Sequence, residues 1–310
     1  MDWRGKTAIV TGGAGFIGSR LTKRLVKLGA RVIVIDNFYT GKEENLQNVG
    51  CEIIKSNVTL INSIKLDNIE PHFIFHLGSP SSDVLFRENP IQCLSDTING
   101  FIEVLKFAKK HQVEKLIYAT SSSVYGKTPS PQSEDDLTQP TNFYGVAKLA
   151  CENIAKLTPE VNSVGLRIFA GYGPGEEHKG EIASVITLFL YQILKGERPV
   201  IFGDGSQGRD FIYIDDIIRA LIISTEKGIE GIINLGTGQS YSFIGALNLL
   251  MEHLGKRITP IFVQKPEGYF DLTKAEISKM KRCLGITPLP LEEGVERYIQ
   301  HIKNNSPDLF

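Results

Sequence analysis

The chain has 310 residues, of which 42% are hydrophobic, and its formal net charge at pH 7 is −1. This composition fits one large or two modest globular domains with an ample apolar core. The nearly balanced charge gives no electrostatic footprint for nucleic acid or an anionic membrane, so small-molecule partners are favoured.

Two further features of the composition bear on location and cofactors. No basic and apolar leader precedes the first expected strand, and no uninterrupted apolar run has membrane-spanning length, so we expect a cytoplasmic protein with no membrane partner. The four cysteines lie far apart and lack the spacing of metal ligands, at positions Cys51, Cys93, Cys151 and Cys283. We therefore expect reduced thiols and no metal site.

Apolar runs alternate with helical patterns through the first half of the chain. Strands are expected at 7–11, 31–36, 52–56, 73–77, 115–120 and 164–169, with helical patterns between them such as 19–28 and 98–111. This alternation predicts an α/β fold with a doubly wound parallel sheet of the Rossmann type.

The pattern changes after Gly173. Helices are expected at 181–195 and 215–226, and short strands at 200–202 and 210–213. We predict a nucleotide-binding domain over 1–170, completed by segments near 210–238. A smaller C-terminal α/β substrate domain is predicted over 171–310.

Three glycines, Gly12, Gly15 and Gly18, directly follow the first strand and open the first helix. The first makes a tight turn, the second lets the backbone approach a pyrophosphate, and the third lets helix and strand pack closely. Asp36 ends the next strand, where it can accept hydrogen bonds from an adenosine ribose. This context predicts a dinucleotide site, and an acid at position 36 favours NAD over NADP because it repels a 2′-phosphate.

A second constellation supplies the chemistry. The strand at 115–120 leads into Ser121, and Tyr144 and Lys148 are spaced to share one face of a helix. Tyrosine ordinarily has a pKa of about 10, too high for a base at neutral pH. We expect the Lys148 ammonium and a positive nicotinamide to favour the phenolate, while Ser121 hydrogen-bonds the substrate oxygen.

With these motifs the chain resembles the extended short-chain dehydrogenases, specifically nucleotide-sugar epimerases and dehydratases of the UDP-galactose 4-epimerase kind. The likeness runs from residue 5 to about 300 and is carried by residues 11–18, 36–37, 76–77, 99–100, 121–126, 144–148, 167–174, 203–213, 215–216 and 234–238. It implies an NAD-dependent nucleotide-diphosphate-sugar epimerase that passes through a transient keto-sugar. A UDP-sugar 4-epimerase is the first expectation.

The resemblance also implies roles for individual residues. Ser121, Tyr144 and Lys148 are its catalytic trio, and Arg209 matches the arginine that binds the substrate diphosphate, a role that suits its rigid fork. The alternative for Arg209 is a simple pairing with Asp210 or Asp204. Cofactor contacts fall on Gly12, Gly15, Phe16, Ile17, Gly18, Asp36, Asn37, Asn57, Val58, Leu77, Asn99, Tyr144 and Lys148.

Departures from the family pattern carry substrate information. The related dehydratases have an Asp-Glu pair after the catalytic hydroxyl, and the decarboxylases of UDP-glucuronate have a glutamate, where this chain has Ser122 and Ser123. Hydroxyl groups cannot do the acid/base work of carboxylates near neutral pH, so elimination of water and decarboxylation are disfavoured. We expect both serines to contact substrate. Ala170 replaces an asparagine that binds the nucleotide phosphate in many relatives, which leaves the nucleotide open.

Residues 175–185 resemble the His-Lys-Gly stretch of ADP-glycero-manno-heptose 6-epimerase, whose lysine is a second acid/base. Lys179 is the matching residue, and a solvated loop lysine is the alternative. A keto-sugar reductase that consumes its cofactor and a non-catalytic NAD-binding regulator are further alternatives, although the regulator would usually lose the trio. Helices at 98–111 and 147–155 match a two-fold interface of relatives, which predicts a homodimer.

Overall fold

The computed structural model describes residues 1–66, 69–265 and 271–309. The chain divides into two compact units that interleave along the sequence. The first unit comprises Met1–Gly126, Leu137–Ile168 and Ile218–Ile233, and the second comprises Lys127–Asp136, Phe169–Ile217 and Asn234–Phe310.

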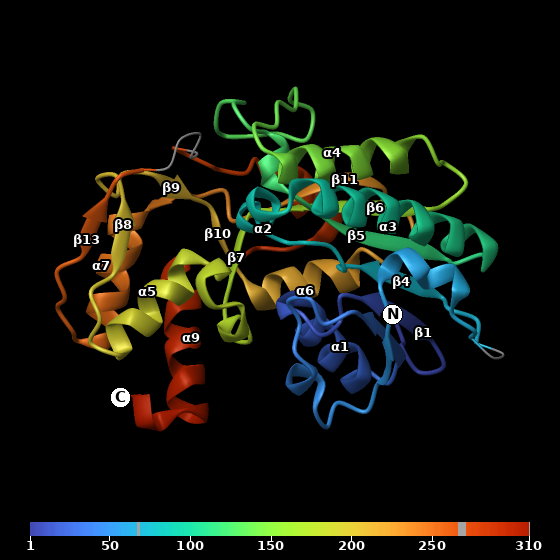
Figure 1. Ribbon diagram of the computed structural model, residues 1–310, viewed down its shortest axis with the longest axis horizontal. Helices are drawn as coiled ribbons and strands as arrows, with labels where there is room; N and C mark the ends of the chain where they lie inside the picture. The colour runs from blue at the N-terminus through green and yellow to red at the C-terminus, as the bar shows by residue number, and fades with distance from the viewer. Residues whose placement is uncertain (67–68, 266–270, 310) are drawn as a thin grey trace. The chain divides into compact units, whose positions relative to one another are not determined.

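A seven-stranded sheet forms the centre of the first unit (Figure 1). Its order is β11-β6-β5-β4-β1-β2-β3, and the pairs from β6 to β3 are parallel. The strands are β1 (Thr7–Thr11), β2 (Arg31–Asp36), β3 (Glu52–Lys55), β4 (Phe73–His76), β5 (Lys115–Ser121), β6 (Ser163–Ile168) and β11 (Gly231–Leu235). The strand order reverses between β1 and β4, and doubly wound sheets bind their ligands at the carboxyl ends of the strands beside such a reversal. The predicted doubly wound α/β fold is confirmed.

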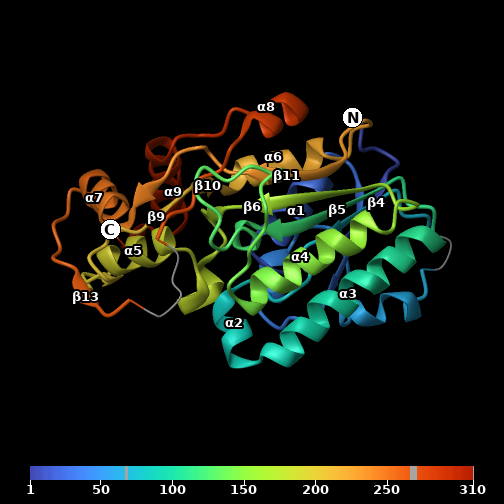
Figure 2. The ribbon, with the colours of Figure 1, turned by 90° about the horizontal axis from the view of Figure 1, so that it is seen from above.

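Helices cover both faces of this sheet, with α3 and α4 on one face and α1 and α6 on the other (Figure 2). The elements are α1 (Phe16–Lys27), α2 (Asp83–Glu88), α3 (Pro90–Lys110), α4 (Phe143–Lys156) and α6 (Ile214–Ile223), with short 3₁₀ turns η1 (Glu43–Leu46), η2 (Val58–Ser63) and η3 (Ser122–Val124). Helix α3 begins eight residues before the predicted start, because Pro90 occupies the first helical position, where its missing N–H costs nothing.

The core of the first unit lies between the sheet and α3. All five residues of β1 are buried, so this central strand has the continuous burial expected of a parallel sheet covered on both faces. Phe101 of α3 is fully buried, and its ring centroid lies 4.8 Å from that of Tyr118 and 5.6 Å from that of His76. Aromatic packing therefore fixes α3 against β4 and β5.

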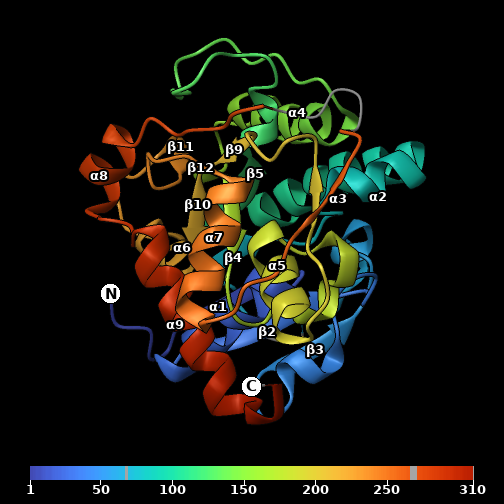
Figure 3. The same ribbon diagram turned by 90° about the vertical axis from the view of Figure 1, so that its left-hand side faces the viewer.

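The second unit contains three two-stranded sheets and several helices (Figure 3). The pairs are β7 (Ala170–Tyr172) with β10 (Phe211–Tyr213), β9 (Gly208–Arg209) with β12 (Tyr241–Ser242), and β8 (Val200–Phe202) with β13 (Ile261–Val263). The helical elements are η4 (Glu177–Ile182), α5 (Val185–Leu194), α7 (Phe243–Leu254), α8 (Ser278–Leu284), α9 (Leu291–Asn305) and η5 (Pro307–Leu309).

The predicted helix at 181–195 was wrong at its start. Helix α5 begins only at Val185, because Ser184 is extended and its Oγ caps the helix by accepting a hydrogen bond from Thr187 N at 3.3 Å. The preceding residues form η4 instead. No helix within the described ranges is both long and apolar enough to cross a membrane.

Truncating the aromatic core tests this packing. Phe101→Ala should lower the free energy of unfolding by about 3–5 kcal/mol, because it leaves a cavity between α3 and the sheet. The matched control Leu60→Ala, at a side chain 56% exposed, should change it by less than about 0.5 kcal/mol. Urea unfolding followed by circular dichroism measures both, and equal effects of the two variants would contradict the assigned core.

Candidate active site

The three glycines of the loop between β1 and α1 differ in whether the fold itself requires them. Gly12 has φ of +69°, and a Cβ added there would meet Gly78 Cα at 2.7 Å. A Cβ at Gly18 would overlap the carbonyl oxygen of Gly12. Gly15 differs, because its φ is −78° and the nearest atom to an added Cβ is Gly12 O at 3.4 Å. The fold therefore requires the first and third glycines, whereas the second leaves an open approach that fits a pyrophosphate.

The carboxylate of Asp36 is held beside this loop by bonds within the protein. Its Oδ2 accepts a hydrogen bond from Ala14 N at 2.8 Å, and its Oδ1 accepts one from Phe38 N at 2.8 Å. The carbonyl oxygen of Ala14 in turn accepts from Lys42 N at 3.1 Å and from Asn45 Nδ2 at 2.8 Å. The segment after β2 thus fixes the loop and the acid in one arrangement. Together with the N-terminus of α1, these residues fit a dinucleotide.

Other predicted cofactor residues follow the carboxyl ends of neighbouring strands in the first unit. Asn37 directly follows β2, and its Oδ1 accepts from Tyr39 N at 3.1 Å. Asn57 and Val58 follow β3, and Asn57 Oδ1 caps η2 by accepting from Thr59 N at 3.0 Å. Leu77 follows β4. Their contacts with the cofactor stay predictions.

Three remaining cofactor predictions lie on helices. Phe16 is buried and Ile17 is partly exposed, both in the first turn of α1. Asn99 is exposed on α3, where its Nδ2 donates to Ser95 Oγ at 3.0 Å. The roles of these residues also stay predictions.

The predicted catalytic trio is brought together within the first unit. Ser121 ends β5, and Asn142 caps α4 by accepting from Gly145 N at 2.8 Å, which places Tyr144 in the first turn of the helix. Ser121 lies close enough to Tyr144 to act on the pKa of its phenol, which it lowers. Lys148 Nζ lies 5.8 Å from the centroid of the Tyr144 ring. The trio therefore has the proximity that proton removal from a substrate hydroxyl requires.

Sequence reasoning missed a partner of Lys148. Lys148 Nζ donates to Ser79 Oγ at 2.7 Å and to Ala119 O at 3.2 Å. Ser79 lies three residues beyond His76, after the carboxyl end of β4. The available signal was the polar residue following the His76-Leu77 motif, since the ends of adjacent parallel strands β4 and β5 meet at one edge.

The electrostatics of the trio depend first on burial. Burial raises the pKa of the Tyr144 phenol, and its hydrogen bond with Ser121 acts in the opposite direction. Burial also lowers the pKa of the Lys148 ammonium. The sequence led us to expect a lowered tyrosine pKa with lysine and nicotinamide both present. The protein alone favours the neutral phenol, because the loss of solvation outweighs the other interactions.

His76 lies beneath this site as a neutral imidazole. Burial, reinforced by the Lys148 charge, lowers its pKa to about 3. Its Nδ1 is 2.8 Å from Thr11 Oγ1. A neutral ring here links β4 to β1 without adding charge near the trio.

Arg209 and its neighbours belong to the second unit. Arg209 Nη1 donates to Gly208 O at 2.8 Å, and its guanidinium carbon lies 5.4 Å from the ring centroid of Phe243.

The two acids near Arg209 in the sequence have partners of their own. The carboxylate of Asp210 accepts from Thr237 N, Thr237 Oγ1, Gly238 N and Ala275 N at 2.6–3.0 Å. Asp204 accepts from Ser206 at 2.6 and 2.9 Å. Other donors thus hold both acids, and the alternative pairing of Arg209 with either acid stays a prediction. Diphosphate binding stays a prediction.

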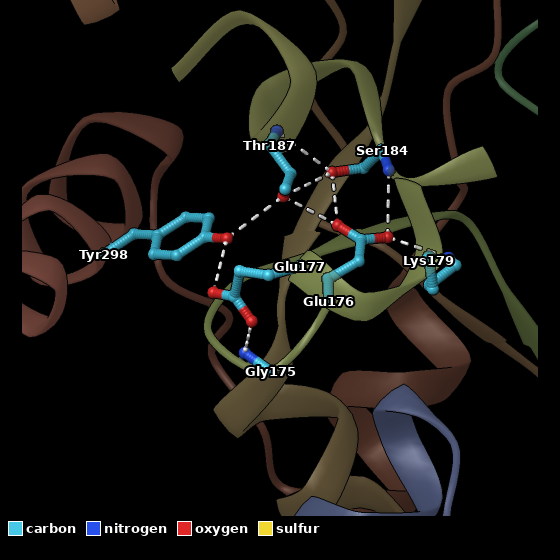
Figure 4. A network of polar contacts seen from close by, with 7 residues as sticks. All are labelled: Gly175, Glu176, Glu177, Lys179, Ser184, Thr187 and Tyr298. Carbon is cyan, nitrogen blue, oxygen red and sulfur yellow. Dashed lines mark hydrogen bonds and ion pairs between the residues drawn. The ribbon is translucent and has the colours of Figure 1, made fainter. Parts of the chain in front are cut away.

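Lys179, also in the second unit, is part of a buried polar network (Figure 4). Its Nζ donates to Glu176 Oε1 at 2.8 Å, and the two side chains are 16% and 1% exposed. Glu176 also accepts from Ser184 N at 2.9 Å and from the hydroxyls of Ser184 and Thr187, each at 2.7 Å. The solvated loop lysine of the alternative is therefore not observed. The pairing gives Lys179 a structural task as counter-ion of a buried carboxylate.

The chain matches a known enzyme family over most of its length. A model of the NAD dependent epimerase/dehydratase family matches residues 8–236. The chain therefore belongs to this family of enzymes, and NAD is its cofactor.

Two curated relatives cover nearly the whole chain. A protein of Methanocaldococcus jannaschii, provisionally named UDP-glucose 4-epimerase, is 32% identical in an alignment that covers 96% of this chain and 99% of the relative. The UDP-glucuronic acid decarboxylase 1 of Xenopus tropicalis is also 32% identical, over 96% of this chain and 72% of its own length.

Two solved structures share the fold. The UDP-glucose 4-epimerase of Thermotoga maritima, solved with UDP-glucose, has a TM-score of 0.90 at 30% identity and covers 96% of this chain and 99% of its own. The ADP-L-glycero-D-manno-heptose-6-epimerase of Helicobacter pylori has a TM-score of 0.86 at 30% identity, covering 96% of each chain.

The glycine loop yields a test of the cofactor site. Gly15→Ala should leave the melting temperature nearly unchanged, because the added methyl finds ordinary contact distances, yet it should weaken NAD binding at least about tenfold by blocking the pyrophosphate. Gly18→Ala is the matched control and should destabilise the protein itself. Calorimetric titration with NAD and thermal melts separate the two effects. Undiminished NAD binding by the Gly15 variant would place the pyrophosphate elsewhere.

Proposed function

We propose that this protein is an NAD-dependent nucleotide-diphosphate-sugar epimerase, most specifically a UDP-sugar 4-epimerase. The observation that carries the proposal is the grouping of Ser121, Tyr144 and Lys148 in the same unit as the glycine loop and Asp36. The epimerases named above support it, because their likeness extends over nearly the whole chain.

The proposed chemistry assigns one task to each side chain. The phenolate of Tyr144 removes the proton from a sugar hydroxyl, while the Ser121 hydroxyl hydrogen-bonds the same sugar oxygen. The Lys148 ammonium stabilises negative charge on Tyr144. NAD held by the glycine loop and Asp36 would supply the hydride acceptor for the sugar carbon and the source of the returning hydride. The keto-sugar presents its other face for the return, so the configuration inverts and no cofactor is consumed.

The residues after Ser121 favour epimerisation over the decarboxylase chemistry named for one relative. Ser122 and Ser123 lie in η3, and Ser123 N donates to Ser121 Oγ at 3.1 Å. Neither side chain provides the carboxyl group that acid/base catalysis of decarboxylation or water elimination uses. We propose that both hydroxyls contact the sugar instead.

A heptose 6-epimerase is the second candidate, because Lys179 matches its second base. The Helicobacter pylori structure fits this chain, but not better than the Thermotoga maritima enzyme at the same identity. The Glu176 pairing of Lys179 also supplies a structural reason for the lysine. We therefore place the UDP-sugar 4-epimerase first.

The proposal includes assembly and location. We propose a homodimer through α3 and α4, where Ile91, Val146 and Leu157, the residue that follows α4, are 83%, 44% and 82% exposed. A two-fold pairing of these helices would bury such apolar side chains. We propose a cytoplasmic location, which suits the four free thiols.

Replacing the tyrosine tests the proposed base. Tyr144→Phe should lower kcat for interconversion of UDP-glucose and UDP-galactose by at least about 100-fold while NAD binding is retained. In the wild type, kcat should rise with pH as the phenol deprotonates, because the phenolate is the active form. Coupled assay of UDP-glucose across pH measures both effects. Near-normal turnover by the variant would remove Tyr144 from the mechanism.

A double variant decides between the two roles of Lys179. Lys179→Met should lower the free energy of unfolding by about 3 kcal/mol, because it leaves the buried Glu176 carboxylate without its cation. Adding Glu176→Gln should recover most of this loss. If Lys179 is structural, the stable double variant epimerises at nearly the normal rate, as we expect.

The contrary outcome has a defined signature. If Lys179 is a second base, the double variant is stable but no longer inverts its substrate. With NADH supplied as the hydride donor, Ser121, Tyr144 and Lys148 would still support reduction of a keto- or aldehyde-sugar analogue from one face. A single stereoisomer, resolved by NMR, would then support the heptose 6-epimerase candidate.

A further inference from the structure

A buried acid continues the catalytic face of α4. Glu152 follows Tyr144 by eight residues and Lys148 by four, so the three side chains share one face of the helix. The Glu152 side chain is only 5% exposed. None of the chemistry proposed above uses it.

The contacts of Glu152 join α4 to two strands. Arg167 of β6 donates from Nε to Oε1 at 3.0 Å and from Nη2 to Oε2 at 2.7 Å. Thr120 of β5 donates from Oγ1 to Oε1 at 2.6 Å. Thr120 and Arg167 are register partners across the two strands, and Thr120 immediately precedes Ser121. One carboxylate therefore ties the helix of the base to the strand of the catalytic serine.

The same arginine also holds the segment after that serine. Its guanidinium carbon lies 4.7 Å from the ring centroid of Tyr125, which follows η3. Tyr125 N donates to Ser122 O at 3.1 Å. Arg167 thus contacts both Glu152 of α4 and Tyr125 in the segment that follows Ser121.

The energetics of such a pair favour a geometric role. Removing two charges from water costs about as much as their attraction returns, so a buried ion pair adds little net stability over apolar side chains. Its bidentate geometry is nevertheless strict, because the planar guanidinium matches the carboxylate in one orientation.

We propose that Glu152, Arg167 and Thr120 form a clamp that sets the rotation and height of α4, and thereby positions Tyr144 and Lys148 relative to Ser121. The inference rests on the proposed function only in taking Tyr144 as the base. Glu152 acts through its neighbours and is a positioning residue.

The clamp has a consequence for the acidity of the base. Burial raises the pKa of Tyr144, and the hydrogen bond with Ser121 opposes that rise. A displaced α4 would weaken this bond and move the Lys148 ammonium away, so the phenolate would form only at higher pH. A clamp variant should therefore raise the pKa of Tyr144 even when the protein is fully folded.

The test titrates the phenol directly. Three variants are prepared with NAD bound: Thr120→Val, Arg167→Lys and Glu152→Gln. The absorbance of tyrosinate is followed against pH in each variant. Tyr144→Phe introduced into each of the three backgrounds provides the blank. We expect the pKa of Tyr144 to rise by about one unit in the Arg167 and Glu152 variants and by less in the Thr120 variant. With UDP-glucose, kcat should fall about tenfold while KM stays within about threefold.

A core variant controls for general destabilisation. Leu105→Ala truncates a side chain that is 4% exposed in the core of α3, and should lower the melting temperature without moving the titration. Should Glu152→Gln fail to fold, the other two variants carry the test. Folded Thr120 and Arg167 variants with an unchanged titration would overturn the clamp, as would an equal shift in the Leu105 control. A wrong sugar assignment would appear separately, as absent wild-type turnover with the titration intact.

Discussion

The parallel alignment of β1, β4 and β5 is the constraint on which the proposed active site depends. Register pairs Thr11 with His76 and His76 with Tyr118, so these strands reach one edge of the sheet at nearly the same level. The glycine loop, the segment carrying Ser79 and the proposed catalytic residue Ser121 all emerge there. The residues proposed for cofactor binding and for proton transfer are thus held at one rigid sheet edge, beside which α4 places Tyr144 and Lys148.

Buried carboxylates recur as fixed points in both units. Asp36, Glu152, Glu176 and Asp210 are each 7% exposed or less, and each accepts at least two hydrogen bonds. A carboxylate in a medium of low dielectric constant tolerates little displacement from its donors. These acids therefore order loops and helices more than they stabilise the fold, since desolvation offsets most of their attraction.

Burial opposes the charged forms of both the proposed base and the neighbouring lysine. The Tyr144 pKa is raised and the Lys148 pKa is lowered in the protein alone, so the neutral phenol and a weakened ammonium are favoured together. The family resemblance identified the residues, but their resting protonation follows from desolvation. Activation of the tyrosine then depends on positive charge supplied with the cofactor and on close contact with Ser121.

Local patterns in the sequence were sufficient to predict the doubly wound sheet, the NAD cofactor and the family. Strand periodicity, the glycine triplet and the Tyr144-Lys148 spacing each act over a few residues. Contacts between distant segments were decided only by the tertiary structure. Ser79 meets Lys148 across 69 positions, and Thr120 meets Glu152 across 32. Such pairings depend on the order of the strands and on the rotation of the helices. Both are set over the whole unit, because a buried charge without a partner is costly wherever it lies. No local pattern in the sequence encodes them.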